Sequence, residues 1–192
     1  VRWHRELPTK PKSAILTRQA GKWYAVFHVE VEKTERAGPN SIGIDFGLSS
    51  LVALSTGETF TRPNWTKRAE RELRRRQRAI SRCKRGSNAR YKRKAGVAKF
   101  QGGVAAKRRD YLHKLSRDLV DRFGRIAIED LNVKGLASGM LAKHVADASW
   151  AQLTAMLAYK AANAGGLLVK VDPRGTSQTC PECGAVAAKT LT

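Results

Sequence analysis

The chain has 192 residues, of which 37 are Lys or Arg and 16 are Asp or Glu, so its net charge is +21. This length suffices for one substantial domain, and the ordinary apolar content predicts a packed core. The charge far exceeds what solubility needs and indicates a polyanionic partner, with nucleic acid favoured over a membrane surface. Since no apolar run is long enough to span a bilayer and no lipidation signal is present, a membrane could be bound only through a peripheral basic patch.

Three cysteines, Cys83, Cys180 and Cys183, form an odd set with one close pair. This pattern is unlike the disulfide framework of a secreted domain and favours a reducing compartment. The first four residues resemble no targeting peptide, so nothing is expected to direct the protein to export.

Residues 13–32 are predicted to form a β-hairpin, with strands at 14–17 and 23–31 around a turn at 19–22. We expect the hairpin to belong to a small sheet or barrel whose other strands are not in this chain, with His28 on its polar face. Residues 34–40 have the composition of a linker. Alternation along the second strand places five apolar residues on one face: Trp23, Ala25, Phe27, Val29 and Val31.

Residues 41–47 are predicted to form a buried strand that delivers one carboxylate, that of Asp45, to the open end of a sheet. A second apolar run at 51–54 and a short strand from 59 follow after turns. An ionised Asp in such a strand is costly to bury unless a charge partner or a metal offsets the cost. The alternative is a strand-end Asp whose carboxylate bonds to turn amides.

Two helices are predicted next, at 64–85 and 91–123, separated by a break at 86–88. Together they indicate a helical hairpin, and Gly102-Gly103 is expected to loosen the middle of its second helix. Cys83, on the apolar face of the first helix, is expected to be a small buried apolar residue. The stripe of the first helix is Trp65, Ala69, Leu73, Ile80 and Cys83, and that of the second is Val97, Phe100, Val104, Tyr111, Leu112, Leu115, Leu119 and Phe123.

A short buried strand is predicted at 125–131, directly after Gly124, which is expected to end the second helix. Like the strand at 42–45, it ends its apolar run with a carboxylate, Glu129. If the two strands are neighbours in one sheet, the acids meet at the same edge, as a Mg²⁺-dependent phosphodiesterase requires. Two ions about 4 Å apart would activate water and steady the leaving oxygen. Alternatively, Glu129 and the following acid simply face solvent.

After a loop at 132–147, a third helix is predicted to begin at Ser149, with Gln152 completing a capping box. Gly165-Gly166 is expected to stop this helix, and residues 167–172 to form a fifth apolar strand. The predicted core face of the helix consists of Trp150, Leu153, Met156, Leu157 and Ala161.

Between residues 67 and 109 the chain carries 18 Lys or Arg and only two acids, Glu70 and Glu72. Mutual repulsion would destabilise the helical hairpin unless phosphates or counterions neutralise it, so we expect binding to a nucleic-acid backbone without sequence readout. The candidate residues are Arg74, Arg75, Arg76, Arg78, Arg82, Lys84, Arg85, Lys92, Arg93, Lys94, Arg108 and Lys114.

The pair Cys180 and Cys183, followed by Gly184, has the spacing of one half of a zinc knuckle. A tetrahedral site needs two further ligands, which do not follow in this chain. A redox dithiol is the competing interpretation, and the absence of a strand-to-helix junction at the pair argues against it.

These motifs, taken in order, resemble the TnpB (OrfB) proteins of bacterial and archaeal insertion sequences, which are relatives of the type V CRISPR nucleases. The resemblance covers nearly the whole chain, and the ordered set is more specific than any single motif. It is carried by IGIDFG at 42–47, DYLHKLS at 110–116, IAIEDL at 126–131, SW at 149–150 and TSQTCPECG at 176–184.

The resemblance implies an α/β fold with an RNase H-like (RuvC) mixed sheet and an RNA-guided DNA endonuclease with Mg²⁺ in its active site. Asp45 and Glu129 would be the first two catalytic carboxylates and metal ligands, and guide RNA and target DNA the partners, with no membrane and no small-molecule substrate. A cytoplasmic, nucleoid-associated prokaryotic protein is expected. The implied domains are the end of a β-barrel-like wedge domain at 1–37, a RuvC domain at 41–172 with the helical hairpin at 64–123, and the start of a zinc ribbon at 173–192.

The chain departs from the family pattern in lacking a second Cys pair and a third catalytic Asp, since Asp172 precedes the cysteines. We therefore expect a fragment that does not cleave by itself and that holds only partial Mg²⁺ and Zn²⁺ sites. The alternative is a nuclease-inactive nucleic-acid-binding protein with the same fold. An RNA-associated structural protein is a weaker alternative that leaves Asp45 and Glu129 unexplained.

Overall fold

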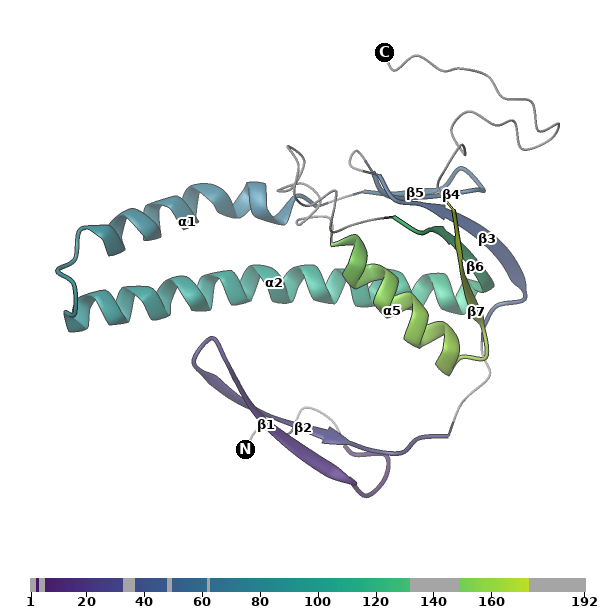
Figure 1. The fold of residues 1–192 in the computed structure, drawn as a ribbon, viewed down its shortest axis with the longest axis horizontal. Coiled ribbons are helices and arrows are strands. Elements are labelled where there is room, and N and C mark those ends of the chain that lie inside the picture. Colours follow the sequence, from purple (N-terminus) through teal and green to yellow (C-terminus); the bar gives the residue numbers. More distant parts are fainter. Residues whose placement is uncertain are drawn as a thin grey trace, which may run out of the picture. The chain divides into compact units, whose positions relative to one another are not determined.

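The computed structural model describes residues 3, 6–32, 37–47, 50–61, 63–131 and 149–172 (Figure 1). The chain divides into two compact units, one made of Val1–Glu35 and Pro63–Ser116 and the other of Arg36–Arg62 and Arg117–Thr192. The predicted loop at 132–147 and the pair Cys180 and Cys183 lie outside the described residues. None of the described helices is long and apolar enough to cross a membrane.

The predicted β-hairpin is present in the first unit as β1 (Ser13–Gln19) and β2 (Lys22–His28), which pair antiparallel from Ser13 opposite His28. Ala20 and Gly21 form the two-residue turn with positive φ angles of 50° and 81°, which match the twist of the strands. The second strand ends at His28 and not at Val31. Both faces expose apolar side chains, with Leu16 at 73% on one face and Ile15 at 51% on the other.

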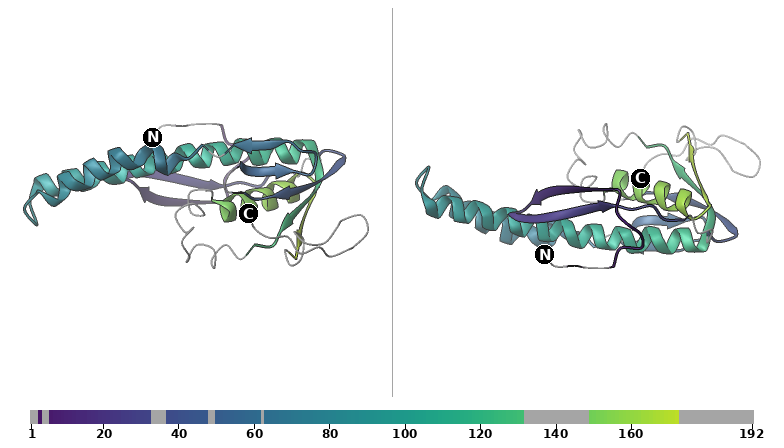
Figure 2. Two further views of the ribbon diagram at one scale, coloured as in Figure 1. Left: turned by 90° about the horizontal axis from the view of Figure 1, so that it is seen from above. Right: turned by 90° about the horizontal axis from the view of Figure 1, so that it is seen from below.

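The helical hairpin is also present, as α1 (Trp65–Ser81) and α2 (Asn88–Arg122), which run alongside each other in Figure 1 and overlap in the two views of Figure 2. Aromatic side chains of the predicted stripes join the helices: the ring centroids of Trp65 and Tyr111 lie 5.5 Å apart. The guanidinium of Arg76 lies 4.9 Å from the ring centroid of Phe100, a cation–π contact. The 3.6-residue periodicity therefore identified the contacting faces correctly.

The helix boundaries differ from the prediction because contacts between the helices set them. Arg90 donates to the carbonyl oxygens of Ile80 (3.0 Å) and Cys83 (3.3 Å), so a side chain of α2 satisfies carbonyls at the end of α1. Cys83 lies beyond the helix, is half-buried, and donates from Sγ to the carbonyl of Ala79. The expected loosening at Gly102-Gly103 is wrong, since α2 is continuous through both residues.

The second unit is built on a five-stranded mixed sheet with the order β5-β4-β3-β6-β7. Strands β4 and β5 continue antiparallel from β3, whereas β3, β6 and β7 are parallel. This confirms an α/β fold with a mixed sheet. The strands are β3 (Asn40–Asp45), β4 (Ser50–Leu54), β5 (Thr59–Thr61), β6 (Phe123–Glu129) and β7 (Leu167–Val171).

The expected helix stop at Gly124 is wrong, because this residue lies inside β6, which begins at Phe123 directly after α2. Close backbone packing explains the glycine: a Cβ on Gly124 would overlap the carbonyl oxygen of Gly38, and a Cβ on Gly166 would lie 2.8 Å from the carbonyl oxygen of Gly124. The three glycines thus allow the segments before β3, in β6 and before β7 to approach each other.

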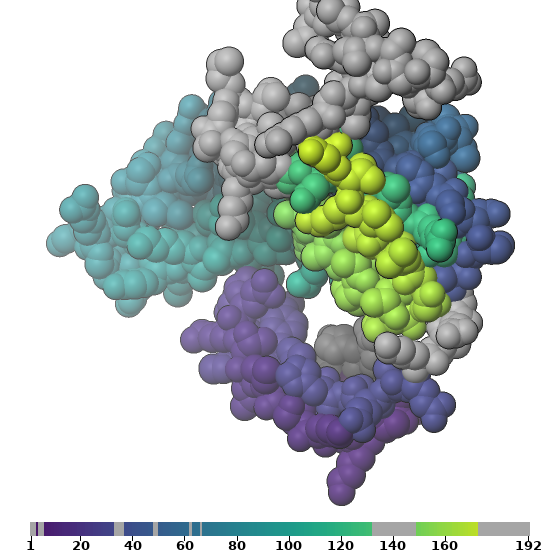
Figure 3. Space-filling view, turned by 45° about the vertical axis from the view of Figure 1, so that its right-hand side comes forward, coloured from purple at the N-terminus to yellow at the C-terminus, as the bar shows by residue number. Residues whose placement is uncertain are grey.

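Helix α5 (Trp150–Asn163) supplies the core face that its sequence predicts, and all five predicted residues are buried. On the sheet, Ile42, Ile44, Ile126 and Ile128 are buried on one face, with exposed fractions of 4% or less. Strand β7 lies at the sheet edge beside α5, as Figure 3 shows in yellow and light green. Its Leu167 is 51% exposed, so the fifth strand is only partly covered.

The predicted capping box at the start of α5 is wrong. Ser149 adopts the left-handed conformation (φ 55°, ψ 40°) and makes no side-chain cap hydrogen bond in the described structure. N-cap side chains normally accept from the first helical amides when the residue is extended, which the left-handed backbone prevents. Instead, the amides of Gln152 and Leu153 donate to the backbone carbonyl of Ser149, each at 3.0 Å.

One charged residue, Lys160, is buried on the core face of α5 with 5% exposure. Burial, aided by the charge of Arg117 and opposed by that of Asp121, lowers the pKa of Lys160 from 10.5. The unfolded state therefore binds more protons than the folded state between the lowered pKa and 10.5, so this residue makes stability rise with pH in that window.

We expect Lys160→Met to remove this contribution. Urea unfolding midpoints measured along a pH series approaching 10.5 should rise for wild type relative to the variant, because only wild type carries the group with the lowered pKa. Parallel pH profiles for the two proteins would contradict the assignment.

Candidate functional site

The two predicted carboxylates lie side by side at one edge of the mixed sheet. Strands β3 and β6 are parallel, and Ile44 pairs with Ile128 in their register. Asp45 and Glu129 directly follow these two residues and are the last residues of their strands. Because neighbouring strands lie about 4.8 Å apart, the two carboxylates are within reach of a shared ligand.

The predicted cost of burying Asp45 does not arise, since this side chain is exposed and Glu129 is half-buried. Asp45 pairs with Ala53 across the antiparallel ladder, and Ala127 precedes Glu129 by two residues on β6. The neighbours Ala53 and Ala127 are thus small, whereas Val171 pairs with Glu129 on the β7 side, and the Asp45 side chain remains open to solvent.

A third carboxylate near the edge, that of Asp130, is occupied by an ion pair. Lys170 Nζ donates to Asp130 Oδ1 at 2.7 Å, and the Asp130 amide donates to the Val171 carbonyl at 2.9 Å. These bonds fix the end of β6 against β7. The sequence signal for this pair was a single Lys inside the apolar run at 167–172, which the sequence analysis did not use.

A cavity of about 390 Å³ in the second unit includes Glu129 in its wall. Its aromatic side is formed by Phe46 and Trp150, whose rings are stacked with centroids 6.4 Å apart. Both residues belong to motifs singled out in the sequence, and the structure brings them together. The lining residues are Phe46, Glu129, Asp130, Leu131, Trp150, Ala151, Thr154, Ala155, Ala158, Leu168 and Lys170.

The donor set at this edge suits a hard divalent cation, because carboxylate oxygens are the ligands that Mg²⁺ prefers. Asp45 and Glu129 provide two such groups from adjacent strands. The described residues contain no group of three or more His, Cys, Asp or Glu arranged to hold a metal. The edge thus presents two carboxylates from adjacent strands, Asp45 and Glu129.

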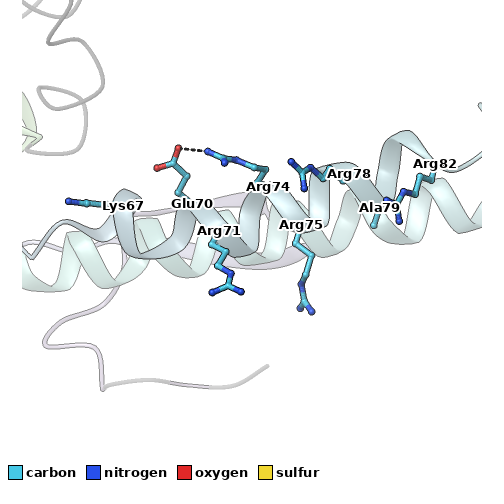
Figure 4. Close-up of a pocket in the computed structure, with 8 residues that line it drawn as sticks. All are labelled: Lys67, Glu70, Arg71, Arg74, Arg75, Arg78, Ala79 and Arg82. Atoms are coloured by element: carbon cyan, nitrogen blue, oxygen red, sulfur yellow. Dashed lines mark hydrogen bonds and ion pairs between the residues drawn. The ribbon is translucent and has the colours of Figure 1, made fainter.

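The basic helical hairpin carries a groove of about 720 Å³ along the outer face of α1. Figure 4 shows the cationic side chains projecting from this face, with Glu70 paired to Arg74. Four of the predicted nucleic-acid-binding residues line it, and two lining cations, Lys67 and Arg71, were not in the predicted set. The lining residues are Lys67, Glu70, Arg71, Arg74, Arg75, Arg78, Ala79 and Arg82.

Other predicted nucleic-acid-binding residues make contacts within the helical hairpin itself. Arg76 packs on Phe100 and donates to Glu72 at 2.7 Å, and Arg93 donates to the carbonyl of Ala79 at 3.3 Å. Lys114 pairs with Asp110 at 2.8 Å, and Arg108 is half-buried. Lys84 and Arg85 lie in the turn between the helices, while Lys92 and Lys94 are exposed on α2. The predicted nucleic-acid-binding residues are therefore not equivalent.

The fold defines a mixed-sheet α/β protein similar to Cas12f1 structures. The chain matches "Cryo-EM structure of the Cas12f1-sgRNA-target DNA complex" with a TM-score of 0.60 and 17% sequence identity, over 85% of this chain and 35% of that one. A second match, "Cryo-EM structure of CRISPR-Cas12f Ternary Complex", has a TM-score of 0.52 and 18% identity, over 84% and 34% of the two chains.

Residues 25–139 match the OrfB_IS605 family, described as "Probable transposase", and residues 150–192 match "Cas12f1-like, TNB domain". The first match covers more than half of the chain, so the chain belongs to the OrfB_IS605 family. The resemblance to TnpB (OrfB) proteins is confirmed.

Curated relatives agree with this membership. A "Putative RNA-guided DNA endonuclease" of Streptomyces pristinaespiralis is 39% identical over 98% of this chain and 48% of its own length. "Putative RNA-guided DNA endonuclease InsQ" of Escherichia coli is 31% identical over 92% and 48%. "CRISPR-associated endodeoxyribonuclease Cas12f1" of Sulfoacidibacillus thermotolerans is 30% identical over 86% and 42%. The chain spans about half the length of the curated relatives it matches.

Proposed function

We propose that this chain is the RuvC-like nuclease portion of a TnpB-like RNA-guided DNA endonuclease. The observation that carries the proposal is the parallel register of β3 and β6, which brings Asp45 and Glu129 to one sheet edge. Two carboxylates on adjacent strands are the beginning of a two-metal phosphodiesterase site. The mixed sheet with β3 at its centre supports an RNase H-like assignment.

In this proposal Asp45 and Glu129 hold Mg²⁺ and a third carboxylate completes the set. Bound Mg²⁺ would supply an activated water and neutralise charge at the phosphate. Asp130 is not assigned to this role, because its carboxylate is paired with Lys170 at 2.7 Å. For zinc, Cys180 and Cys183 have the spacing of two thiolate ligands and would open a zinc ribbon at 173–192.

The partners in this proposal are guide RNA and target DNA. Two relatives named as putative RNA-guided DNA endonucleases and the similar Cas12f1 structure, solved as a complex with sgRNA and target DNA, support this choice. The exposed apolar faces of the β1–β2 hairpin support a role as part of a larger barrel-like wedge domain, since an isolated hairpin would leave them in water.

The full-length protein that carries this chain, loaded with its guide RNA, should cut matching plasmid DNA only when Mg²⁺ is present. EDTA should stop cutting and excess Mg²⁺ should restore it, because the carboxylates at the sheet edge need the cation to approach a phosphate. Gel assays of cleavage and fluorescence anisotropy of binding would be run in parallel.

Binding without EDTA-sensitive cutting would identify the nuclease-inactive nucleic-acid-binding alternative and overturn the enzyme assignment. Full cutting in EDTA would overturn the metal site. A protein that neither binds nor cuts nucleic acid would overturn the proposed function altogether.

A further inference from the structure

The cations that line the groove on α1 share one face of the helix. From Lys67 through Arg71, Arg78 and Arg82 they follow steps of four, seven and four residues, the spacing of a single helical stripe. The opposite face contacts α2 through Trp65 and Arg76. The stripe thus faces away from α2, on a helix whose opposite face is packed against α2.

The stripe has the dimensions of a short length of nucleic-acid backbone. Lys67 and Arg82 are separated along the helix axis by roughly 22 Å, and each four-residue step adds about 6 Å. The four-residue step is close to the separation of successive phosphates along one strand, so Lys67 with Arg71 and Arg78 with Arg82 form two pairs that each match consecutive phosphates, with a gap of about 10 Å between the pairs. Backbone contacts of this kind carry no sequence information.

Glu70 is the only acid among the described residues that line the groove, and its carboxylate pairs with Arg74 at 3.1 Å. A phosphate in the groove would meet this negative charge and compete for Arg74. Glu72, two residues along the same helix, lies outside the lining set and pairs with Arg75 at 2.9 Å and Arg76 at 2.7 Å. The two acids therefore carry the same charge, but only Glu70 lines the groove.

We propose that the groove of α1 binds the phosphate backbone of one nucleic-acid strand lying along the helix, and that Glu70 limits the affinity by repelling phosphate and holding Arg74. The proposal rests on the proposed function in taking nucleic acid as the partner. The ligand chemistry is a run of phosphodiesters, which single-stranded RNA and single-stranded DNA share.

The test compares Glu70→Gln and Glu72→Gln in the full-length protein carrying this chain. Each removes one negative charge and frees one lining cation, Arg74 or Arg75, but only Glu70→Gln removes an acid from the groove lining itself. Anisotropy with labelled RNA and DNA oligonucleotides of unrelated sequence would be measured over a salt series. Glu70→Gln should tighten binding about 3- to 10-fold, and Glu72→Gln should stay within about twofold of wild type.

A second variant tests the cations directly. The double substitution Arg71→Gln with Arg78→Gln should weaken binding and reduce the slope of log K against log salt by about 1.4, since each lost phosphate contact on a single strand removes about 0.7. Unchanged thermal unfolding would show that the exposed substitutions leave the fold intact. A larger effect with RNA than with DNA identifies the guide as the occupant, and the reverse identifies the target strand.

Equal effects of the two Glu variants would contradict the proposed groove site, because affinity would then depend only on total charge. Weaker binding by Glu70→Gln would contradict it as well. An unchanged salt slope in the double Arg variant would overturn it as well. In either case, binding by wild type leaves the proposed function standing, whereas failure of wild type to bind any oligonucleotide overturns both proposals.

Discussion

Asp45→Asn is expected to lower DNA cleavage by the full-length protein carrying this chain by more than about a hundredfold. The substitution keeps the size of the side chain and replaces the charged carboxylate of a proposed metal ligand with a neutral amide at the end of β3. A metal ion supplies several kcal/mol of transition-state stabilisation, and each 1.36 kcal/mol is tenfold in rate. Guide-loaded protein, matched plasmid and Mg²⁺ in a time course provide the measurement.

Asp130→Asn is the matched control, because it makes the same chemical change one residue after Glu129. The Asp130 carboxylate is balanced by Lys170 at 2.7 Å and is not assigned to the metal. We expect this variant to retain most of the activity, and Glu129→Gln to lose it as Asp45→Asn does. All three should still bind nucleic acid. If Asp45→Asn cuts at the wild-type rate, the proposed active site is wrong.

The strands that carry these acids were predictable because each is a short apolar run ending in a carboxylate. Ile42 and Ile44 alternate with Gly43, and Ile128 occupies the corresponding position before Glu129. Alternation shows which residues share a face, but not which strand lies beside which. The parallel register of β3 and β6, on which the candidate site depends, required the structure.

The helices show the same division between local and tertiary information. Their contacting faces follow from periodicity, as the contact of Trp65 with Tyr111 shows. Their ends do not, since side chains such as Arg90 from the partner helix bond to the last carbonyls of α1. Ser149 was predicted as a cap from its residue type, yet its left-handed backbone prevents that role.

Composition identified the helical hairpin as basic, but not which of its cations line the groove on α1. The predicted set included Arg76 and Arg93, which contact Phe100 and the Ala79 carbonyl within the helical hairpin. It omitted Lys67 and Arg71, which line the groove. The helical period would have separated the two groups, because the apolar stripe marks the face that contacts α2 and the groove lies opposite.

Gly124→Ala is expected to destabilise the second unit by about 3 kcal/mol or more. A Cβ at this position would overlap the backbone carbonyl oxygen of Gly38, and backbone atoms cannot move aside as the end of a flexible side chain can. Overpacking of this kind typically costs about 1–3 kcal/mol and occasionally more. Since domains are stable by only about 5–15 kcal/mol, the urea midpoint should fall markedly.

Gly103→Ala is the matched control, because it adds the same methyl group to the same chain with the opposite expected sign. Gly103 lies inside α2, and apart from its chain neighbours and the nearby backbone of its own helix no described atom is within 4 Å of the position that its Cβ would occupy. Alanine in place of a helix-interior glycine stabilises by about 0.5–1 kcal/mol, so the urea midpoint should rise. If Gly124→Ala leaves the urea midpoint unchanged or raises it as Gly103→Ala is expected to do, close backbone packing at Gly38 and Gly124 is not the reason for the glycine in β6.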